Sequence, residues 1–178
     1  DISLPLQEQN IPNATSPSTR PSGSLMINQG HAFTNKSQVQ LQVQTQNASS
    51  MAVAENECPT KDSNLWFEVV DHMDWNLSDP DGSKSVYLLL KNSQGEVSQC
   101  ISASIVLDQI PPSLQVNAGP ELMTATKNAS FKLAASDENS GIDKIYCRLG
   151  DESTFSECPT EFSKNDLTEG THSMNLYV

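Results

Sequence analysis

The fold that the sequence predicts depends most on residues 146–178, which read YCRLGDESTFSECPTEFSKNDLTEGTHSMNLYV. Cys147 and Cys158 stand on either side of a Gly-Asp-Glu-Ser turn, a pattern typical of a β-hairpin. A Gly-Thr-His turn then leads into a strand in which Met174 and Leu176 alternate with other residues. A strand in a β-sandwich needs a neighbour on each side or cover for its edge. The sequence therefore raises the question of which segment covers this strand.

The composition favours all-β structure, because Ser, Thr, Asn and Gln are abundant and helix-favouring runs of Ala, Leu, Glu and Lys are scarce. The net charge of −12 argues against binding to nucleic acid or to anionic lipid through a basic patch. The longest apolar stretch, Val86–Leu90, is far shorter than the ~20 residues that span a membrane, so no membrane insertion is expected. The chain begins without Met or a signal peptide, which indicates a mature or excised product.

The four cysteines indicate disulfides, and an even number allows two bridges in any of three connectivities. Structural zinc is the competing interpretation, but it requires close Cys-x2-Cys pairs, which this sequence lacks. Disulfides persist in oxidising compartments. We therefore expect the protein to be extracellular or on the cell surface.

A weak internal repeat divides the chain. The segment SGSLMINQGHAFTNKSQVQLQVQT, from Ser22, aligns with PPSLQVNAGPELMTATKNASFKLAAS, from Pro111. A repeat of roughly ninety residues made of short strands is typical of a β-sandwich. We predict an N-terminal extension at residues 1–22 and domains at 23–109 and 110–178. Strands are expected near residues 25–28, 38–45, 51–54, 66–70, 85–90, 97–107, 114–117, 130–135, 143–149, 154–157 and 172–178.

The N-terminal extension contains a strand-like segment on a linker. In residues 1–7, DISLPLQ, the apolar side chains of Ile2, Leu4 and Leu6 alternate as in a single strand. Pro5 weakens this interpretation, because proline in a strand is confined to edges or bulges. Residues 8–22 are rich in Pro, Ser and Thr, which is typical of a linker.

Both repeats carry motifs of a known family. The second has Tyr146-Cys147-Arg-Leu, Phe155, Cys158-Pro159, Leu167 and Gly170-Thr-His-Ser; the first has Trp75-Asn-Leu, Asp81-Gly-Ser-Lys-Ser-Val-Tyr and Leu107-Asp-Gln-Ile-Pro. Over about residues 22–178, these motifs resemble the bacterial Ig-like repeats of large surface proteins. The resemblance implies two tandem immunoglobulin-like β-sandwich domains. The family continues into one more strand after residues 172–178, so the second domain is expected to lack its last strand.

The expected hairpin suggests the disulfide pairing. Cys147 and Cys158 flank it and can face each other across neighbouring strands, which leaves Cys58 to pair with Cys100. In the chain-entropy model the shorter loop constrains the unfolded state by about 3 kcal/mol. The redox-active alternative requires Cys-x-x-Cys, which is absent.

No motif indicates an enzyme, a cofactor or a strong metal site. His31, His72 and His172 occur in unrelated contexts, and neither Gly-x-Ser-x-Gly nor a phosphate-binding loop is present. We interpret the acidic segment DHMD at 71–74 as a solvated loop. The segments at 78–82 and 136–141 suit turns better than a twelve-residue calcium loop, although weak calcium binding stays open.

Two further features have open alternatives. Asn-x-Ser/Thr occurs at Asn13, Asn35, Asn47, Asn76 and Asn128 and would accept glycans in a eukaryotic secretory product; with a bacterial resemblance we expect these sites to be unmodified. Trp66 and Trp75 could bind a sugar or a protein partner. We expect both tryptophans to fill a core instead, because they match framework positions of the family.

The spare N-terminal segment and the uncovered C-terminal strand suggest one function. Residues 1–7 of one subunit could complete the second domain of the next by strand addition, with Ile2, Leu4 and Leu6 packing beside Met174 and Leu176. This contact is head-to-tail and does not close, so it builds a filament of identical subunits. The alternatives are a fragment of a longer repeat protein, and the stalk or tip of an adhesin that binds glycan or protein.

Overall fold

The computed structural model describes residues 20–150 and 152–178. Apart from one short 3-10 turn, η1 (Asn28–Gly30), every regular element in these residues is a β-strand. The strands form four sheets. The prediction of an all-β chain is confirmed.

Two of the sheets belong to residues 20–109, which we call the N-terminal unit. One sheet has the order β1 (Ser22–Ile27), β3 (Gln38–Gln46) and β6 (His72–Asn76), all antiparallel. The other has the order β2 (Phe33–Thr34), β8 (Ile101–Leu107), β7 (Gly82–Lys91), β4 (Ser50–Glu55) and β5 (Phe67–Glu68). In that sheet only β2 and β8 are parallel.

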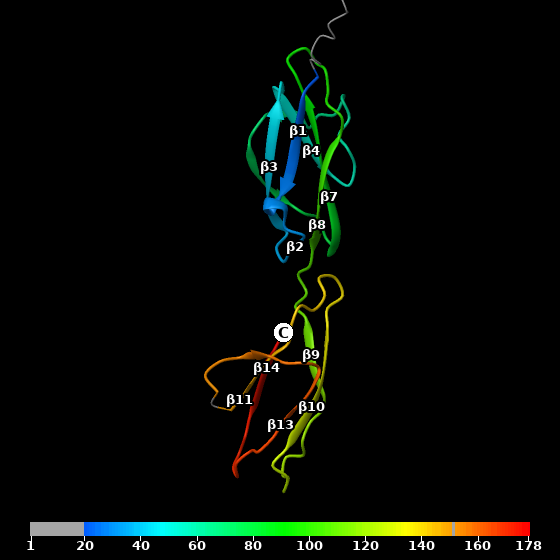
Figure 1. The fold of residues 1–178 in the computed structure, drawn as a ribbon. Helices are drawn as coiled ribbons and strands as arrows, with labels where there is room; N and C mark the ends of the chain where they lie inside the picture. The colour runs from blue at the N-terminus through cyan, green and yellow to red at the C-terminus, as the bar shows by residue number, and fades with distance from the viewer. Residues whose placement is uncertain (1–19, 151) are drawn as a thin grey trace, which may run out of the picture.

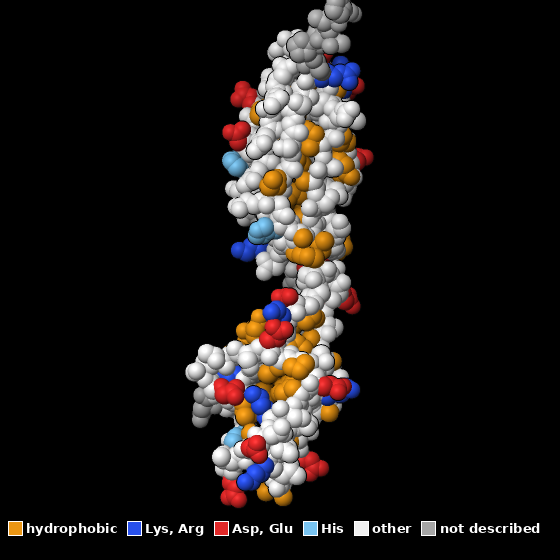
Figure 2. Space-filling model, viewed as in Figure 1, with side chains coloured by type: hydrophobic (Ala, Val, Ile, Leu, Met, Phe, Trp, Pro, Cys, Tyr) orange, Lys and Arg blue, Asp and Glu red, His pale blue; other side chains and the backbone are white. Residues whose placement is uncertain are grey.

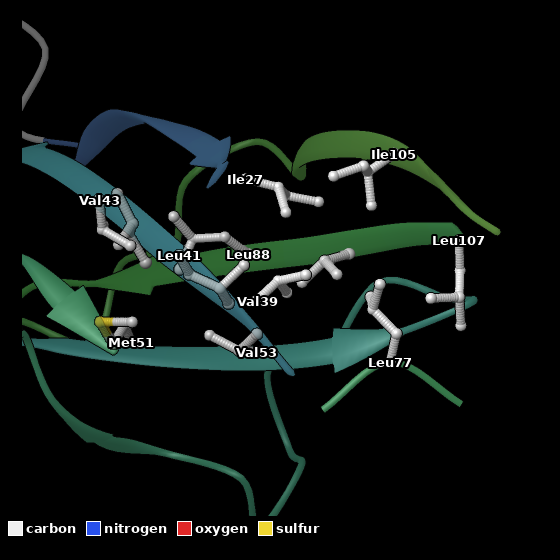
Figure 3. Close-up of a cluster of buried hydrophobic side chains, with 12 residues drawn as sticks. Ile27, Val39, Leu41, Val43, Met51, Val53, Leu77, Leu88, Ile105 and Leu107 are labelled. Carbon is white, nitrogen blue, oxygen red and sulfur yellow. The ribbon is translucent and has the colours of Figure 1, made fainter. Parts of the chain in front are cut away.

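The core of the N-terminal unit follows from alternation along its strands. Side chains of Val39, Leu41 and Val43 point inward from β3, while the glutamines between them lie at or near the surface. They meet Val53, Leu88 and other apolar side chains from the facing sheet (Figure 3). Twelve buried residues make up this cluster.

The other two sheets belong to residues 110–150 and 152–178, which we call the C-terminal unit. One sheet has the order β13 (Glu161–Lys164), β10 (Ala129–Ser136) and β9 (Ser113–Ala118). The other has the order β12 (Ser156–Glu157), β11 (Tyr146–Leu149) and β14 (Met174–Tyr177). All pairs are antiparallel. The two units lie end to end, and β14 runs back toward the N-terminal unit (Figure 1).

A short connection with a buried carboxylate joins the units. Asp108 follows β8 directly and is 7% exposed. Its Oδ1 accepts a hydrogen bond from the Ile110 backbone N–H at 3.2 Å, and its Oδ2 accepts one from the Ser140 N–H at 2.9 Å. Because Ser140 belongs to the C-terminal unit, this carboxylate connects the end of β8 to the loop that follows β10.

The structure adds three strands that the sequence analysis did not predict: β2, β6 and β13. The prediction of a solvated loop at residues 71–74 is wrong, since His72–Asn76 form β6 and pair with β3. Met73 and Trp75 pack against the core from this strand, while His72, Asp74 and Asn76 are exposed. The charged residues on the outer face of an edge strand hid its alternation.

Candidate functional site

The most distinctive surface of the chain is the free edge of β14. In the N-terminal unit β7 pairs with β4 on one side and with β8 on the other. In the C-terminal unit β14 pairs with β11, and within residues 20–150 and 152–178 no strand pairs with its other edge. We call this the open edge.

Hydrogen bonds show that β14 corresponds to β7. The N–H of Leu77 donates to the Ser37 carbonyl at 2.9 Å, and the N–H of Leu167 donates to the Lys127 carbonyl at the same distance. The Ser85 carbonyl accepts from Asn56 at 3.0 Å, just as the Ser173 carbonyl accepts from Gly150 at 2.6 Å. Residues 82–90, GSKSVYLLL, therefore correspond one by one to residues 170–178, GTHSMNLYV.

Matched residues in the two units differ in burial. Val86 and Leu88 of β7 are completely buried. Their counterparts Met174 and Leu176 are only half-buried, although they point toward the cluster formed by the C-terminal unit. That cluster contains four buried residues, against twelve in the N-terminal unit. The difference follows from the strand β8, which covers β7 and has no counterpart beside β14 in the described residues.

The backbone of β14 is oriented to accept a further strand. In an antiparallel pair, successive residues direct their N–H and C=O groups alternately toward and away from the partner. The carbonyl of Ser173 faces β11, because it accepts the hydrogen bond from Gly150. Met174 and Leu176 therefore direct their backbone groups toward the open edge. An unpaired row of this kind is a template for another chain.

A cavity of about 460 Å³ adjoins the start of β14. The apolar residues Phe131, Leu149, Leu167 and Met174 line it, together with polar residues that include Glu121, Asn128 and His172. Hydrophobic side chains also gather at the surface of this unit on the face shown in Figure 2.

The rim of this cavity carries two fully exposed apolar side chains. Leu122 and Met123, in the loop between β9 and β10, are 105% and 89% exposed. Adjacent apolar side chains with this much exposure are a feature of interaction surfaces. This loop has no motif in the sequence, and its one local signal is the pair of adjacent apolar residues, Leu122 and Met123.

The predicted assembly residues divide between the described and undescribed parts of the chain. Met174 and Leu176 lie on β14 with their side chains toward the cluster that contains Leu133 and Ile145. Ile2, Leu4 and Leu6 lie outside the described residues. Whether these two groups meet stays a prediction.

The cysteines form two different arrangements. Cys58 and Cys100 are joined by a disulfide, with their Cα atoms 6.2 Å apart. Cys147 and Cys158 are buried thiols that contact each other. Desolvation, followed by the hydrogen bond to Cys147, raises the pKa of the Cys158 thiol to about 12. The predicted Cys147–Cys158 disulfide is therefore absent from this structure, while the contact between the two thiols leaves their oxidation a prediction.

The outer face of the sheet that contains β14 carries an aromatic cluster, which the sequence analysis missed. The rings of Tyr146 and Tyr177 stack with centroids 4.9 Å apart, and Phe155 meets Tyr177 edge-on at 4.8 Å. The Arg148 guanidinium lies 4.8 Å from the Phe155 ring centroid. Phe155 and Tyr177 are exposed. We call these four residues the aromatic face.

The tryptophans lie in the N-terminal unit. Trp75 is partly buried against the core, as predicted. Trp66 instead lies outside that cluster, where its Nε1 donates to the Lys61 carbonyl at 3.0 Å and Lys91 Nζ lies 4.0 Å from the ring centroid. The expectation that Trp66 fills the core is wrong, because it precedes the short edge strand β5.

The acidic segments serve as turns in this structure. Asp137 Oδ1 accepts hydrogen bonds from the backbone N–H groups of Asn139, Ser140 and Gly141, at 2.8–3.1 Å. Desolvation raises the pKa of Asp137, but these hydrogen bonds outweigh it and hold the pKa below its ordinary value. Among residues 20–150 and 152–178, no group of three or more His, Cys, Asp or Glu is placed to hold a metal ion.

No protein-family model and no curated protein matches the sequence. Among solved structures, the chain is similar to the fibronectin(III)-like modules of Clostridium thermocellum CbhA, at 12% identity over 85% of this chain and 83% of that chain, with a TM-score of 0.44. It is also similar to the human OSCAR ligand-binding domain, at 18% identity over 89% and 90% of the two chains, with a TM-score of 0.36. Both scores are below 0.5, so neither similarity supports a conclusion about function.

No helix in the described part of the chain has the length and apolar character needed to cross a membrane.

Proposed function

We propose that the chain is a non-catalytic, extracellular structural subunit of a bacterial surface filament. It consists of two tandem immunoglobulin-like β-sandwich domains, at residues 23–109 and 110–178, and the second lacks its last strand. Residues 1–7 of one subunit add to the second domain of the next. The observation that supports this proposal is the open edge of β14, with its unpaired backbone groups and the adjoining cavity, which apolar residues line in part.

The geometry favours addition between subunits over addition within one chain. Ser22 starts β1 at the end of the N-terminal unit remote from the C-terminal unit (Figure 1). The ten residues of β7 and the eight of β10 span about 60 Å in the two units together. Residues 8–21 reach about 50 Å at full extension. Residues 8–21 therefore fall short of the far end of their own C-terminal unit, where β14 begins, and they reach that end of a neighbour stacked end to end.

An extracellular location is supported by the disulfide between Cys58 and Cys100, since such bridges persist in oxidising compartments. The acidic net charge of −12 favours solubility and argues against nucleic acid as a partner.

The alternative is that these residues are part of a longer repeat protein. A later segment of the same chain would then supply the last strand of the second domain. A denaturing gel without reductant separates the two sources. Strand-exchanged fibres resist detergent when cold, so unboiled samples should give a ladder of multiples that collapses to the monomer on boiling. A chain without residues 1–7 should run as a monomer in both lanes.

The matched control is a chain whose residues 1–7 are replaced by a polar sequence of equal length. It keeps the length of the extension and should also give no ladder. A monomer band for the unaltered chain in both lanes, at concentrations where it is folded, would exclude the filament.

The second candidate function is binding of glycan or protein by an adhesin stalk or tip. The observation in its favour is the aromatic face, because exposed aromatic rings beside an Arg are typical anchors of interfaces. A glycan array with the folded chain tests it, with Phe155→Ser as the variant that removes one exposed ring. Binding that this substitution abolishes would favour the adhesin.

A further inference from the structure

We infer that the added strand runs antiparallel to β14 with Leu4 opposite His172 and Leu6 opposite Gly170, so that both leucines fill the cavity and Pro5 faces away from β14. This inference rests on the proposed function and specifies its direction and register. The N-terminal unit supplies the template, because it contains both the equivalent strand and its partner.

The partner of β7 shows which positions need apolar side chains. In β8, Ala103 pairs with Val86, Ile105 with Lys84, and Leu107 with Gly82. Ile105 is 2% exposed and Leu107 is completely buried. The residues of the C-terminal unit that correspond to Val86, Lys84 and Gly82 are Met174, His172 and Gly170. A strand added there therefore needs its largest apolar residues opposite His172 and Gly170.

The cavity lies at this place. Its lining includes residues Gly170 to Met174 and Leu167. Leu167 corresponds to Leu77, which is buried in the same cluster as Ile105 and Leu107. The cavity is thus the space that the two β8 side chains fill in the N-terminal unit. Leu122 and Met123 at its rim would then cover the added leucines.

Alternation fixes which face of residues 1–7 turns inward. A slip by one residue would place Ser3, Pro5 and Gln7 toward the core and expose the leucines. A shift by two that puts Leu6 opposite His172 would place Glu8 opposite Gly170, at a cavity whose described lining includes Glu121 and neither Lys nor Arg. The opposite shift would leave Leu6 beyond the cavity and Met174 uncovered. Only one register matches apolar residues to all three positions.

Pro5 fits this register. It takes the position of Val106, whose N–H donates to the Ala32 carbonyl at 2.9 Å on the side away from β7. A residue at that position gives no N–H to β7, so proline there removes no hydrogen bond to β14. The proline that weakens a strand interpretation in general is compatible with an outer strand in this orientation.

The direction also suits a filament. An added strand antiparallel to β14 ends, at Leu6, near the loop between β9 and β10, which lies at the end of the molecule remote from the N-terminal unit (Figure 1). The linker that follows it leaves the subunit at that end. The donor's N-terminal unit then stacks end to end on the acceptor's C-terminal unit.

Cysteine cross-linking of the full chain tests the register. In the inferred pairing Ser3 lies opposite Ser173 on the outer face, at a spacing that suits a disulfide. The variant that combines Ser3→Cys with Ser173→Cys should give a ladder that survives boiling without reductant and collapses with reductant. The single Ser3→Cys variant is the control for the native cysteines and should collapse on boiling alone.

Two further double variants report the shifted registers. Ser3→Cys with Asn175→Cys reports the shift that brings Leu6 to His172, and Ser3→Cys with Thr171→Cys reports the opposite shift. If the ladder survives boiling in either of these variants but not in the variant with Ser173→Cys, the inferred register is wrong and the proposed assembly is still supported. A boiling-sensitive ladder in all three would also overturn it. Absence of any ladder, even unboiled, would reject the proposed assembly itself.

Discussion

The two units share one strand plan but differ at one edge. β1, β3 and β6 correspond to β9, β10 and β13, and β4, β5 and β7 correspond to β11, β12 and β14. The N-terminal unit adds β8 beside β7 and β2 beside β8. In the described residues of the C-terminal unit, neither has a counterpart.

This difference shows how much of a sandwich core one edge strand completes. β8 contributes Ile105 and Leu107 to the core and shields Val86 and Leu88 from water. Without such a strand, Met174 and Leu176 stay half-buried and a cavity adjoins Met174. At about 25 cal/mol per Å² of apolar surface, covering this edge provides a driving force of several kcal/mol for any segment that fits.

The largest expected effect is loss of assembly on placing a charge at the cavity. Leu6→Glu puts a carboxylate where Leu107 lies in the N-terminal unit, and an unpaired buried charge costs several kcal/mol. We expect the ladder on an unboiled gel to disappear. Gln7→Glu adds the same charge on the outer face and should keep the ladder. Equal loss in both variants would show that net charge, and not the cavity, controls assembly.

The disulfide of the N-terminal unit should give the largest effect on folding. Replacing Cys58 and Cys100 by Ser releases a loop with a sequence separation of 42, which costs about 4 kcal/mol in the chain-entropy model. Denaturant unfolding followed by tryptophan fluorescence measures it, because both tryptophans belong to this unit. An unchanged midpoint would mean that the bridge does not constrain the unfolded chain.

The two cysteines of the C-terminal unit should respond to the compartment in which the chain folds. We expect Cys147 and Cys158 to be joined in chains exported to an oxidising compartment, as the hairpin predicts, and to be thiols after cytoplasmic expression. Alkylation under denaturing conditions followed by intact mass counts the free thiols in each. Two alkylated cysteines in exported material would reject the second bridge.

Sequence patterns predicted the strands that alternate and missed those that depend on a neighbour. Val39, Leu41 and Val43 indicated β3, and Met174 with Leu176 indicated β14. β13 contains a single large apolar residue, Phe162, and β2 forms only because β8 lies beside it. Neither strand has a local signal.

The candidate site was predicted only in part. The alternation of residues 172–178 and the expected missing partner pointed to the edge, and the match between GSKS at 82–85 and GTHS at 170–173 was visible in the sequence. The cavity and the aromatic face depend on how loops and strands distant in sequence come together. No period or spacing in one segment records that arrangement.

Truncating matched leucines should give unequal costs. Leu88 is fully buried, so Leu88→Ala is expected to lower the free energy of unfolding of its unit by about 3 kcal/mol. Leu176 is half-buried, and Leu176→Ala should cost the monomer about 1 kcal/mol. Hydrogen exchange resolved by residue separates the two units. In the polymer, the cost of Leu176→Ala should rise toward that of Leu88→Ala.

The junction between the units should respond to loss of one carboxylate. Asp108→Asn keeps the shape of the side chain and removes the charge that accepts the bonds from Ser140 and Ile110. Bonds to charged groups contribute about 2 kcal/mol each. We expect faster independent tumbling of the two units in NMR relaxation. Asp74→Asn, on the exposed face of β6, changes the charge equally without touching these bonds and is the control.

The smallest expected effect is on a carboxyl pKa in the turn before β7, which differs from the matching turn before β14. Asp81, just before Gly82, accepts hydrogen bonds from the Gln109 side chain at 3.0 Å and from its backbone N–H at 2.7 Å. These bonds, the side-chain bond first, hold the pKa of Asp81 below its ordinary value of 3.8. Glu169 stands in the matching position before Gly170, and among the described residues of the C-terminal unit no strand equivalent to β8 brings a glutamine to it.

A lowered carboxyl pKa stabilises the fold above the ordinary value, and this contribution is lost as the pH falls through the folded value. We therefore expect the turn at Asp81 to loosen only below pH 3.8, as measured by carboxyl-detected NMR titration. Gln109→Ala removes the larger of the two bonds and should raise the pKa of Asp81 toward 3.8, while the backbone bond keeps part of the shift. If the titration of Asp81 is the same with and without the Gln109 side chain, β8 does not anchor this turn, and the two units differ only in their core.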